Sequence, residues 1–298
     1  MRCIFVVSCG LLLATAASSP ALAQDVRGGG RGDTTFVWTG RIADGGTLTI
    51  KNIVGDIRVT EASGDRVEVR AAKRTRGRDP ADITFDVNES SSAATICTVF
   101  RGDSACEEGN SYGNVRMSVQ YSIAMPRGLR LRASTGNGEL SIERAGSEVD
   151  VRTGNGAIHV GQTEGRVTAA TGNGDLEIEG AKGPVRATSG NGRIFVATSS
   201  GPVSAQTGNG DVEVRMKSLD AESDMDFQTG SGGIRVTLPA DFNGEFEAST
   251  GNGELRSDFE IKIVGRFDPQ HIHGVIGRGG RVIKMQTGNG RLEIRKGS

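Results

Sequence analysis

The stretch ATGNGDLEIEGAKGPVRATSGNGRIFVA, residues 170–197, decides the fold, because the Thr-Gly-Asn-Gly that begins at residue 171 returns as Ser-Gly-Asn-Gly at residue 189. Self-similarity at a fixed interval is the signature of a repeat protein. The first five copies of the motif begin 18 residues apart, and the later steps are 22, 21 and 37 residues. The eight copies begin at Thr135, Thr153, Thr171, Ser189, Thr207, Thr229, Thr250 and Thr287.

Apolar and polar residues alternate on both sides of each motif. Val167 and Ala169 precede the copy at Thr171, and Leu176 and Ile178 follow it. Alternation with a period of two is typical of a strand with one buried face. Each repeat is therefore predicted to contain two short strands and two turns, and we expect no helices after the leader.

Two all-β architectures can be built from such a unit. An Asn-Gly turn between apolar runs can close an antiparallel hairpin, which would make the chain a meander. Alternatively, each repeat is one coil of a parallel β-solenoid (β-helix), with equivalent residues stacked about 4.8 Å apart. The solenoid of about 18-residue coils is favoured, because like residues recur at like positions and the second turn repeats in phase as Gly183-Pro184 and Gly201-Pro202.

The Gly-Asn-Gly segments are predicted to form the corners of the coils. Both glycines, for example Gly172 and Gly174, are expected to adopt positive φ, which larger residues avoid. Stacked asparagine side chains can hydrogen-bond to one another along the solenoid, with Ser231 as one short substitute. The predicted corner ladder consists of Asn137, Asn155, Asn173, Asn191, Asn209, Asn252 and Asn289.

The first residues have the features of a secretory signal peptide over residues 1–23. Arg2 gives a positive start, an apolar run follows, and Ala21-Leu22-Ala23 fits cleavage before Gln24. No later stretch is apolar enough for a membrane helix. We therefore expect an exported protein in the periplasm or on the surface of a bacterium.

The remainder is expected to be a flexible lead followed by one domain. Residues 24–35 form the lead, and 36–298 form a single solenoid. Its coils are predicted to be irregular over 36–130 and regular over 131–298, with a diverged rung at 256–280. The charged end RLEIRKGS is expected at the C-terminal edge of the stack, because open strand edges invite aggregation unless they are protected.

Charge and cysteine content limit the partners and the compartment. The 298 residues have a formal net charge of −1, which gives no reason to expect a nucleic-acid partner. Cys3 and Cys9 leave with the leader, so that Cys97 and Cys106 remain as an even pair. In an oxidising compartment they are predicted to form a disulfide that clamps a protruding loop.

The residues that could carry chemistry form no catalytic, cofactor or metal pattern. The position after each Gly-Asn-Gly includes Arg193 and Arg291, which would repel calcium. His271 and His273 share a strand face near Asp268, but an exposed pair of histidines needs no metal. We therefore predict no catalytic residue, no cofactor and no metal ligand.

Two short signals are weak. Arg-Gly-Asp occurs at 31–33 and 101–103, but the tripeptide arises easily by chance in a chain rich in Arg and Gly. The basic segment 70–78 could contact anionic lipid headgroups or glycans, although a solvated turn explains it as well.

Three segments carry a family resemblance. GTLTIKNIVGDIRVTEASGDRVEVRAAKR begins at residue 46, YSIAMPRGLRLRASTGNGELSIE at 121 and GVIGRGGRVIKMQTGNGRLEIRK at 274. Over residues 36–296 the chain resembles the putative-adhesin family of bacterial envelope proteins, which are β-strand-repeat domains without an assigned function. The resemblance implies an extracytoplasmic β-solenoid and supplies no catalytic residues to transfer.

The function indicated is non-enzymatic. We expect a binding, adhesion or scaffold protein of the bacterial cell envelope, whose partner is an envelope glycan, a protein or another copy of the chain. One alternative is a polysaccharide-acting enzyme with a groove near residues 256–280, and another is a structural protein that assembles end to end.

Overall fold

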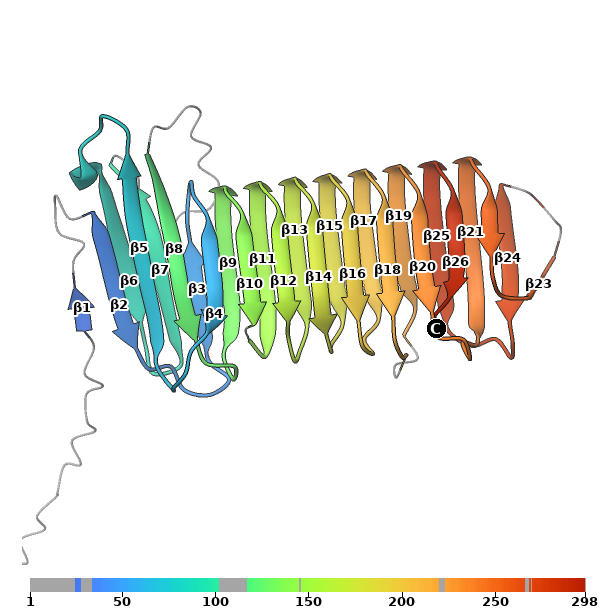
Figure 1. Ribbon diagram of the computed structural model, residues 1–298, viewed down its shortest axis with the longest axis horizontal. Helices are drawn as coiled ribbons and strands as arrows, with labels where there is room; N and C mark the ends of the chain where they lie inside the picture. Colours follow the sequence, from blue (N-terminus) through green and yellow to red (C-terminus); the bar gives the residue numbers. More distant parts are fainter. Residues whose placement is uncertain are drawn as a thin grey trace, which may run out of the picture.

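A computed structural model of the protein describes residues 25–27 by their backbone only, and 34–101, 117–144, 146–219, 223–265, 268 and 270–297 in full. The described chain is a long stack of β-strands with two walls (Figure 1), each a sheet of 13 strands. We call the sheet that contains β1 sheet A and the other sheet B. The expected signal peptide and its cleavage site before Gln24 lie outside the described residues.

Equivalent strands of successive repeats lie side by side and run parallel. Leu176 pairs with Ile158 on one side and with Ile194 on the other, and both walls keep this kind of register. The predicted parallel β-solenoid is therefore confirmed, and the antiparallel meander is wrong. The regular rungs are formed by β9 (Arg130–Asn137), β10 (Leu140–Arg144), β11 (Glu148–Asn155), β12 (Ile158–Gln162), β13 (Val167–Asn173), β14 (Leu176–Ala181), β15 (Val185–Asn191), β16 (Ile194–Thr198), β17 (Val203–Asn209), β18 (Val212–Met216), β19 (Met225–Ser231) and β20 (Ile234–Leu238).

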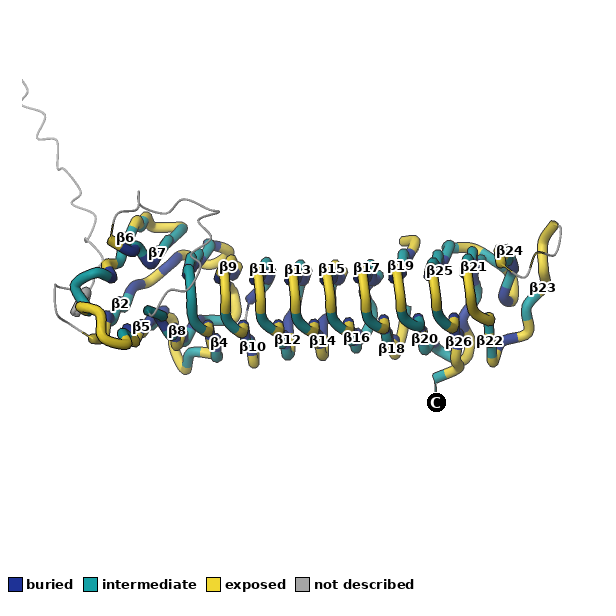
Figure 2. Tube along the Cα trace, turned by 90° about the horizontal axis from the view of Figure 1, so that it is seen from above, coloured by how far each residue is buried: buried dark blue, intermediate teal, exposed yellow. Residues whose placement is uncertain are grey.

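Alternate residues of each strand fill the narrow space between the two walls. Val167 and Ala169 on sheet B and Leu176 and Ile178 on sheet A are at most 1% exposed. Burial of each aliphatic side chain of this kind stabilises the fold by about 1.5–3 kcal/mol. The walls lie close together over the regular rungs (Figure 2), because Val, Ile, Leu and Ala supply most of the core there.

The two glycines of each corner do different things. Gly174 has a φ of 148°, and the last glycine of each neighbouring motif also has positive φ. The first glycine, such as Gly172, does not, so the expectation of positive φ on both sides of Asn is wrong. The first glycine is needed for a different reason. A Cβ on Gly172 would lie 2.5 Å from the carbonyl oxygen of Gly154 in the preceding rung.

The last rung of the chain does not lie at the end of the stack. β25 (Val282–Asn289) pairs with β19 and with β21 (Gly244–Asn252), and β26 (Leu292–Lys296) lies between β20 and β22 (Leu255–Ser257). The chain thus leaves a gap of one rung after β20, and its final strands fill this gap (Figure 1). The expectation that RLEIRKGS forms the C-terminal edge is wrong.

The C-terminal end of the stack is built from residues 256–280, where the sequence indicated a diverged rung. β22, β23 (Ile261–Ile263) and β24 (His271–Ile276) occupy this segment. β24 runs antiparallel to both β21 and β23, so no further rung continues the parallel pattern of sheet B. The divergence reflects a change from a stacking rung to a cap.

At the N-terminal end, too, the spatial order of the strands differs from their order in the sequence. One rung stacks on β9 and β10, a second lies outside it although it comes later in sequence, and antiparallel strands complete both sheets. The only helix among the described residues is a short 3-10 turn, and none of them forms a helix that could cross a membrane. The elements are β1 (Asp25–Arg27), β2 (Thr35–Gly40), β3 (Thr47–Lys51), β4 (Ile57–Glu61), β5 (Val67–Thr75), η1 (Pro80–Asp82), β6 (Ile83–Glu89), β7 (Ala93–Phe100) and β8 (Met117–Met125).

Substitutions at one corner separate the two glycine requirements. Gly174→Val combines a strained backbone with a Cβ only 2.2 Å from the carbonyl oxygen of Gly156. We expect it to lower the free energy of unfolding by more than the about 1–3 kcal/mol that backbone strain alone costs. Gly172→Val should also destabilise, through overlap alone, whereas the exposed Glu177→Ala should change stability by about 0.5 kcal/mol or less. Thermal unfolding followed by circular dichroism measures all three, and equal small shifts would contradict the two glycine requirements.

Candidate functional site

Asparagine side chains form a hydrogen-bonded row along one corner of the stack. The Nδ2 of Asn155 donates to the Oδ1 of Asn137 at 2.8 Å, and the same bond joins each neighbouring pair as far as Asn209. Ser231 follows in the register, and the row resumes where Asn252 donates to Asn289 at 2.9 Å. Because these amides bind one another, the row acts as a structural element.

The hydroxyl group that begins each motif has a structural role that sequence reasoning missed. The Oγ1 of Thr171 donates to the carbonyl oxygen of Gly156 at 2.9 Å, and Ser189 makes the equivalent bond to Gly174 at 3.0 Å. All the other copies repeat this bond across one rung step. The signal in the sequence was the restriction of this position to Thr or Ser, since only a small β-hydroxyl can face inward there and still donate.

The outer face of sheet B is hollow along the row of first glycines. A shallow cavity of about 610 Å³ lies over Gly208, Gly230 and Gly288, which are exposed and have no side chain to fill it. We call this cavity the glycine trough, and its wall away from the corner carries only hydroxyl and amide groups. These lining side chains are Thr188, Gln206, Gln228, Ser249 and Gln286.

One carboxylate fixes part of the wall of the trough. Asp226 accepts hydrogen bonds from Nε2 of Gln228 at 2.9 Å and from Nε2 of Gln206 at 3.3 Å. The carbonyl oxygens of the two amides then remain as acceptors. The trough therefore presents an ordered row of amide and hydroxyl groups, with the carboxylate of Asp226 beside it, that runs along the axis of the solenoid.

Two of the acidic residues that follow the corners on sheet A, Asp175 and Asp211, bind backbone N–H groups. The Oδ1 of Asp175 accepts the backbone N–H of Arg193 at 2.8 Å, and Asp211 does the same for Gly233 at 2.7 Å. Each carboxylate thereby joins its own rung to the next one. No group of three or more His, Cys, Asp or Glu side chains that could hold a metal occurs in the described parts of the chain.

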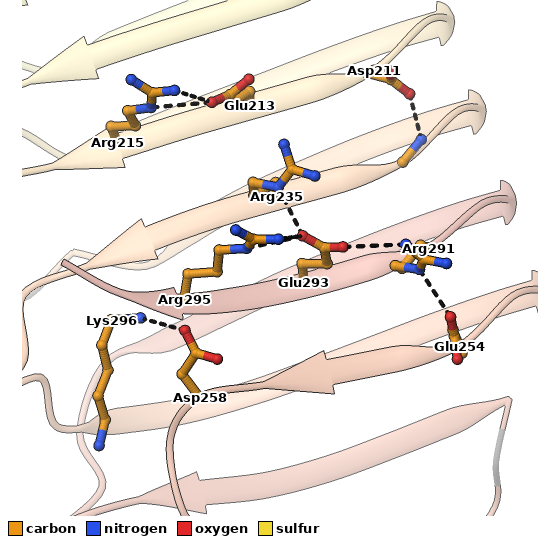
Figure 3. A network of polar contacts seen from close by, with 11 residues as sticks. Asp211, Glu213, Arg215, Arg235, Glu254, Asp258, Arg291, Glu293, Arg295 and Lys296 are labelled. Carbon is orange, nitrogen blue, oxygen red and sulfur yellow. Dashed lines mark hydrogen bonds and ion pairs between the residues drawn. The ribbon is translucent and has the colours of Figure 1, made fainter.

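Among the residues that the structure describes, the most buried carboxylate is Glu293, on the inserted strand β26. Its side chain is 8% exposed and lies among three arginines (Figure 3). Arg235 Nε donates to Oε2 at 2.7 Å, Arg295 Nε donates to the same oxygen at 3.0 Å, and Arg291 lies 3.5 Å from Oε1. The hydrogen bond from Arg235 is the main reason why the pKa of Glu293 falls to about 2.

The sequence alone could not reveal this cluster. Arg235 and Glu293 are 58 residues apart, and they meet only because β26 pairs with β20. The residues that the sequence analysis considered as possible metal ligands do not form one site. The Oδ1 of Asp268 accepts a bond from the backbone of Gln270, and His273 lies 3.4 Å from Glu245, so these groups do not converge with His271 on one point.

The remaining sequence signals lie on the N-terminal coils. Cys97 is buried in β7, and Cys106 lies outside the described residues, so their disulfide stays a prediction. The Arg-Gly-Asp segment at 31–33 and residues 102–103 of the second one also lie outside the described residues. Within the basic segment 70–78, Lys73 is buried and donates to the carbonyl oxygen of Pro80, which reduces the charge available at the surface.

These features define a class of protein, an elongated β-solenoid whose inward residues and corners maintain the stack and whose outer rows differ between the two walls. The chain belongs to the Toastrack DUF4097 family, which matches residues 46–295. The resemblance to an adhesin-like family of unassigned function is thereby confirmed.

Three solved structures match the chain at low identity. A putative adhesin from Parabacteroides distasonis is 11% identical with a TM-score of 0.39, covering 89% of this chain and 99% of its own. A putative adhesin from Bacteroides fragilis is 12% identical with a TM-score of 0.36, covering 88% and 96%. A putative cell adhesion protein from Clostridium sporogenes is 10% identical with a TM-score of 0.23, covering 93% and 100%. No curated protein matches the chain.

The buried carboxylate gives a pH-dependent prediction. The pKa of Glu293 is lower in the folded protein than its ordinary value of 4.5, so its stabilising effect is present above pH 4.5 and is lost as the pH falls toward 2. Glu293→Gln should therefore lower the free energy of unfolding by about 1–3 kcal/mol at neutral pH. The difference from the unchanged protein should shrink steadily below pH 4.5. Chemical denaturation between pH 2 and 7 measures it, and a difference that is independent of pH would refute the assignment.

Proposed function

We propose that the protein is an exported, non-enzymatic binding protein of the bacterial cell envelope, and that it binds neutral polysaccharide in the glycine trough. The single observation that carries this proposal is the trough itself. Its wall carries amides at Gln206, Gln228 and Gln286, which recur on three adjacent rungs and follow the axis of the stack.

The spacing of the trough suits a linear polymer. Gln206, Gln228 and Gln286 are register partners on adjacent strands, so equivalent groups recur about 4.8 Å apart. A polysaccharide repeats its hydroxyl groups along its length and can engage several rungs at once, which raises its effective affinity without any single strong contact. Because the trough is open and shallow, it holds such a chain without enclosing it.

Location and mode of action follow from the same proposal. The leader over residues 1–23 directs export, and either the periplasm or the cell surface would present envelope glycans to the trough. The paired carboxylates that a glycosidase uses need to lie about 5–10 Å apart across the scissile bond. Within the described chain the trough is lined by amides, hydroxyls and glycines, so binding without cleavage is the activity we expect.

A paired variant tests the proposal. Gln206→Ala combined with Gln228→Ala removes two amides from the wall, and we expect at least a tenfold loss of affinity for neutral polysaccharide. Binding to a glycan array, followed by calorimetry with the best ligand, measures the loss. Ser204→Ala on the same strand is the matched control, because this residue faces outward in a different row. Unchanged binding by the paired variant, or release of shortened products, would exclude the proposed function.

A further inference from the structure

Two arginines and a serine lie side by side on the outer face of sheet A, near its N-terminal end. Arg70 on β5 and Arg58 on β4 are both register partners of Ser122 on β8, the strand between them. All three residues are exposed, whereas the residues before and after each of them in its strand are buried. The three side chains therefore point away from the core from adjacent strands.

These side chains share one open cavity of about 190 Å³. At about 30 Å³ for each water molecule of the liquid, this volume corresponds to roughly six waters. The cavity therefore suits one small polar group rather than a length of polymer. Its other lining residues are Thr60, Glu68, Ile123 and Ala124.

The hydrogen-bond donors around the cavity are largely unused. No described residue forms an ion pair or a hydrogen bond with the Arg58 side chain or with the Ser122 hydroxyl group. Nε and Nη2 of Arg70 both contact Oε1 of Glu68, which leaves Nη1 for a further acceptor. Donors from three strands thus face a common space that contains no acceptor for them except Glu68.

The cavity also has an excess of positive charge. Of the residues that line it, Glu68 is the one acid, and it is paired with Arg70, so that the charge of Arg58 is not compensated. Asp56, two residues before Arg58, accepts hydrogen bonds from an amide side chain and from a backbone N–H. Arg74, exposed on the same face of β5, adds to the positive potential. An anion is therefore attracted to this point of the face.

We propose that Arg58, Ser122 and Arg70 bind a phosphate group. A guanidinium group offers paired N–H donors that match two phosphate oxygens, and the serine hydroxyl between the arginines supplies a further donor. A carboxylate has two oxygens in one plane, which a single arginine can satisfy. A phosphate directs its oxygens toward several sides, as donors from three adjacent strands require. Because the cavity is open, the group that carries the phosphate stays outside it.

The bacterial envelope contains two sources of this chemistry, a phospholipid headgroup and a soluble phosphorylated saccharide. The basic segment identified in the sequence continues beyond the cavity through Arg76 and Arg78, both exposed in the turn after β5. Clustered basic residues are attracted to anionic lipid surfaces. The same three residues bind the phosphate from either source, and the experiment separates the two.

Titration of the full exported chain with inorganic phosphate and with glycerol 3-phosphate tests the site. The NMR signals of the arginine Nε–H groups and of the Ser122 amide report binding. Arg58→Gln should weaken binding at least about tenfold, and Ser122→Ala about threefold. Arg58→Lys keeps the charge but loses the paired donors, so it should also weaken binding. The matched control is Arg132→Gln, which removes an exposed arginine from the outer face of sheet B and should leave binding unchanged.

Vesicles identify the source of the phosphate. The chain is sedimented with phosphatidylcholine vesicles that contain about 20 mol% phosphatidylglycerol, with pure phosphatidylcholine vesicles as the control. Binding that is lost in Arg58→Gln assigns the phosphate to a lipid headgroup. Binding of glycerol 3-phosphate without binding to vesicles assigns it to a soluble phosphate ester. Thermal unfolding confirms that every variant folds.

Three outcomes would overturn the inference. The first is the absence of shifts with either soluble phosphate up to about 50 mM. The second is binding, to soluble phosphate or to vesicles, that Arg58→Gln leaves intact. The third is acetate binding as tightly as inorganic phosphate, because this would remove the argument from the shape of the anion. The trough variant Gln206→Ala with Gln228→Ala should leave phosphate binding unchanged, so this inference and the proposed function can fail independently.

Discussion

The structure depends on one constraint, which is that each rung must give its backbone hydrogen bonds to the rung beside it in exact register. The N–H of Gly174 donates to the carbonyl of Asn191, and the N–H of Leu176 to that of Arg193, and the equivalent bonds recur along the stack. A residue inserted within a strand would move the inward side chains that follow it in that strand to the outer face, and the longer repeats of 22 and 21 residues have their additional residues in turns between strands. This explains why Thr171, Asn173 and the two glycines recur in step, whereas the outward positions vary.

The repeated motif therefore predicts the structure of one rung and the stacking of its copies. It does not predict which rung lies beside which, because the candidate neighbours carry the same motif. The motif at Thr287 fits against any other motif, so nothing in its own sequence shows that β25 pairs with both β19 and β21. The link over 239–243 carries the chain past the gap, and the link over 277–281 brings it back into the gap. The cluster around Glu293 could not be predicted for the same reason. The role of Thr171 could have been, since a hydroxyl inside an apolar row needs an acceptor.

The same constraint leaves the two outer faces free to differ. On sheet B the first glycine of each corner is required because a side chain would collide with the next rung, and the trough is a consequence of that requirement. The wall beside it then needs only short or amide side chains to remain neutral. On sheet A the stack does not restrict the outward residues, and acidic and basic side chains both occur there.

The inserted rung of β25 and β26 joins the main stack of coils to the last coil at the C-terminal end. Until β25 and β26 are in place, β19 and β20 on one side and β21 and β22 on the other present unpaired edges, and unpaired parallel edges invite association with other chains. The final residues of the chain close both edges at once, and Glu293 then gains its bonds to Arg235 and Arg295. A rung at the end of the stack is paired on one side only and could fray, whereas this rung is paired on both sides and is also held by the ion pair between Glu293 and Arg235.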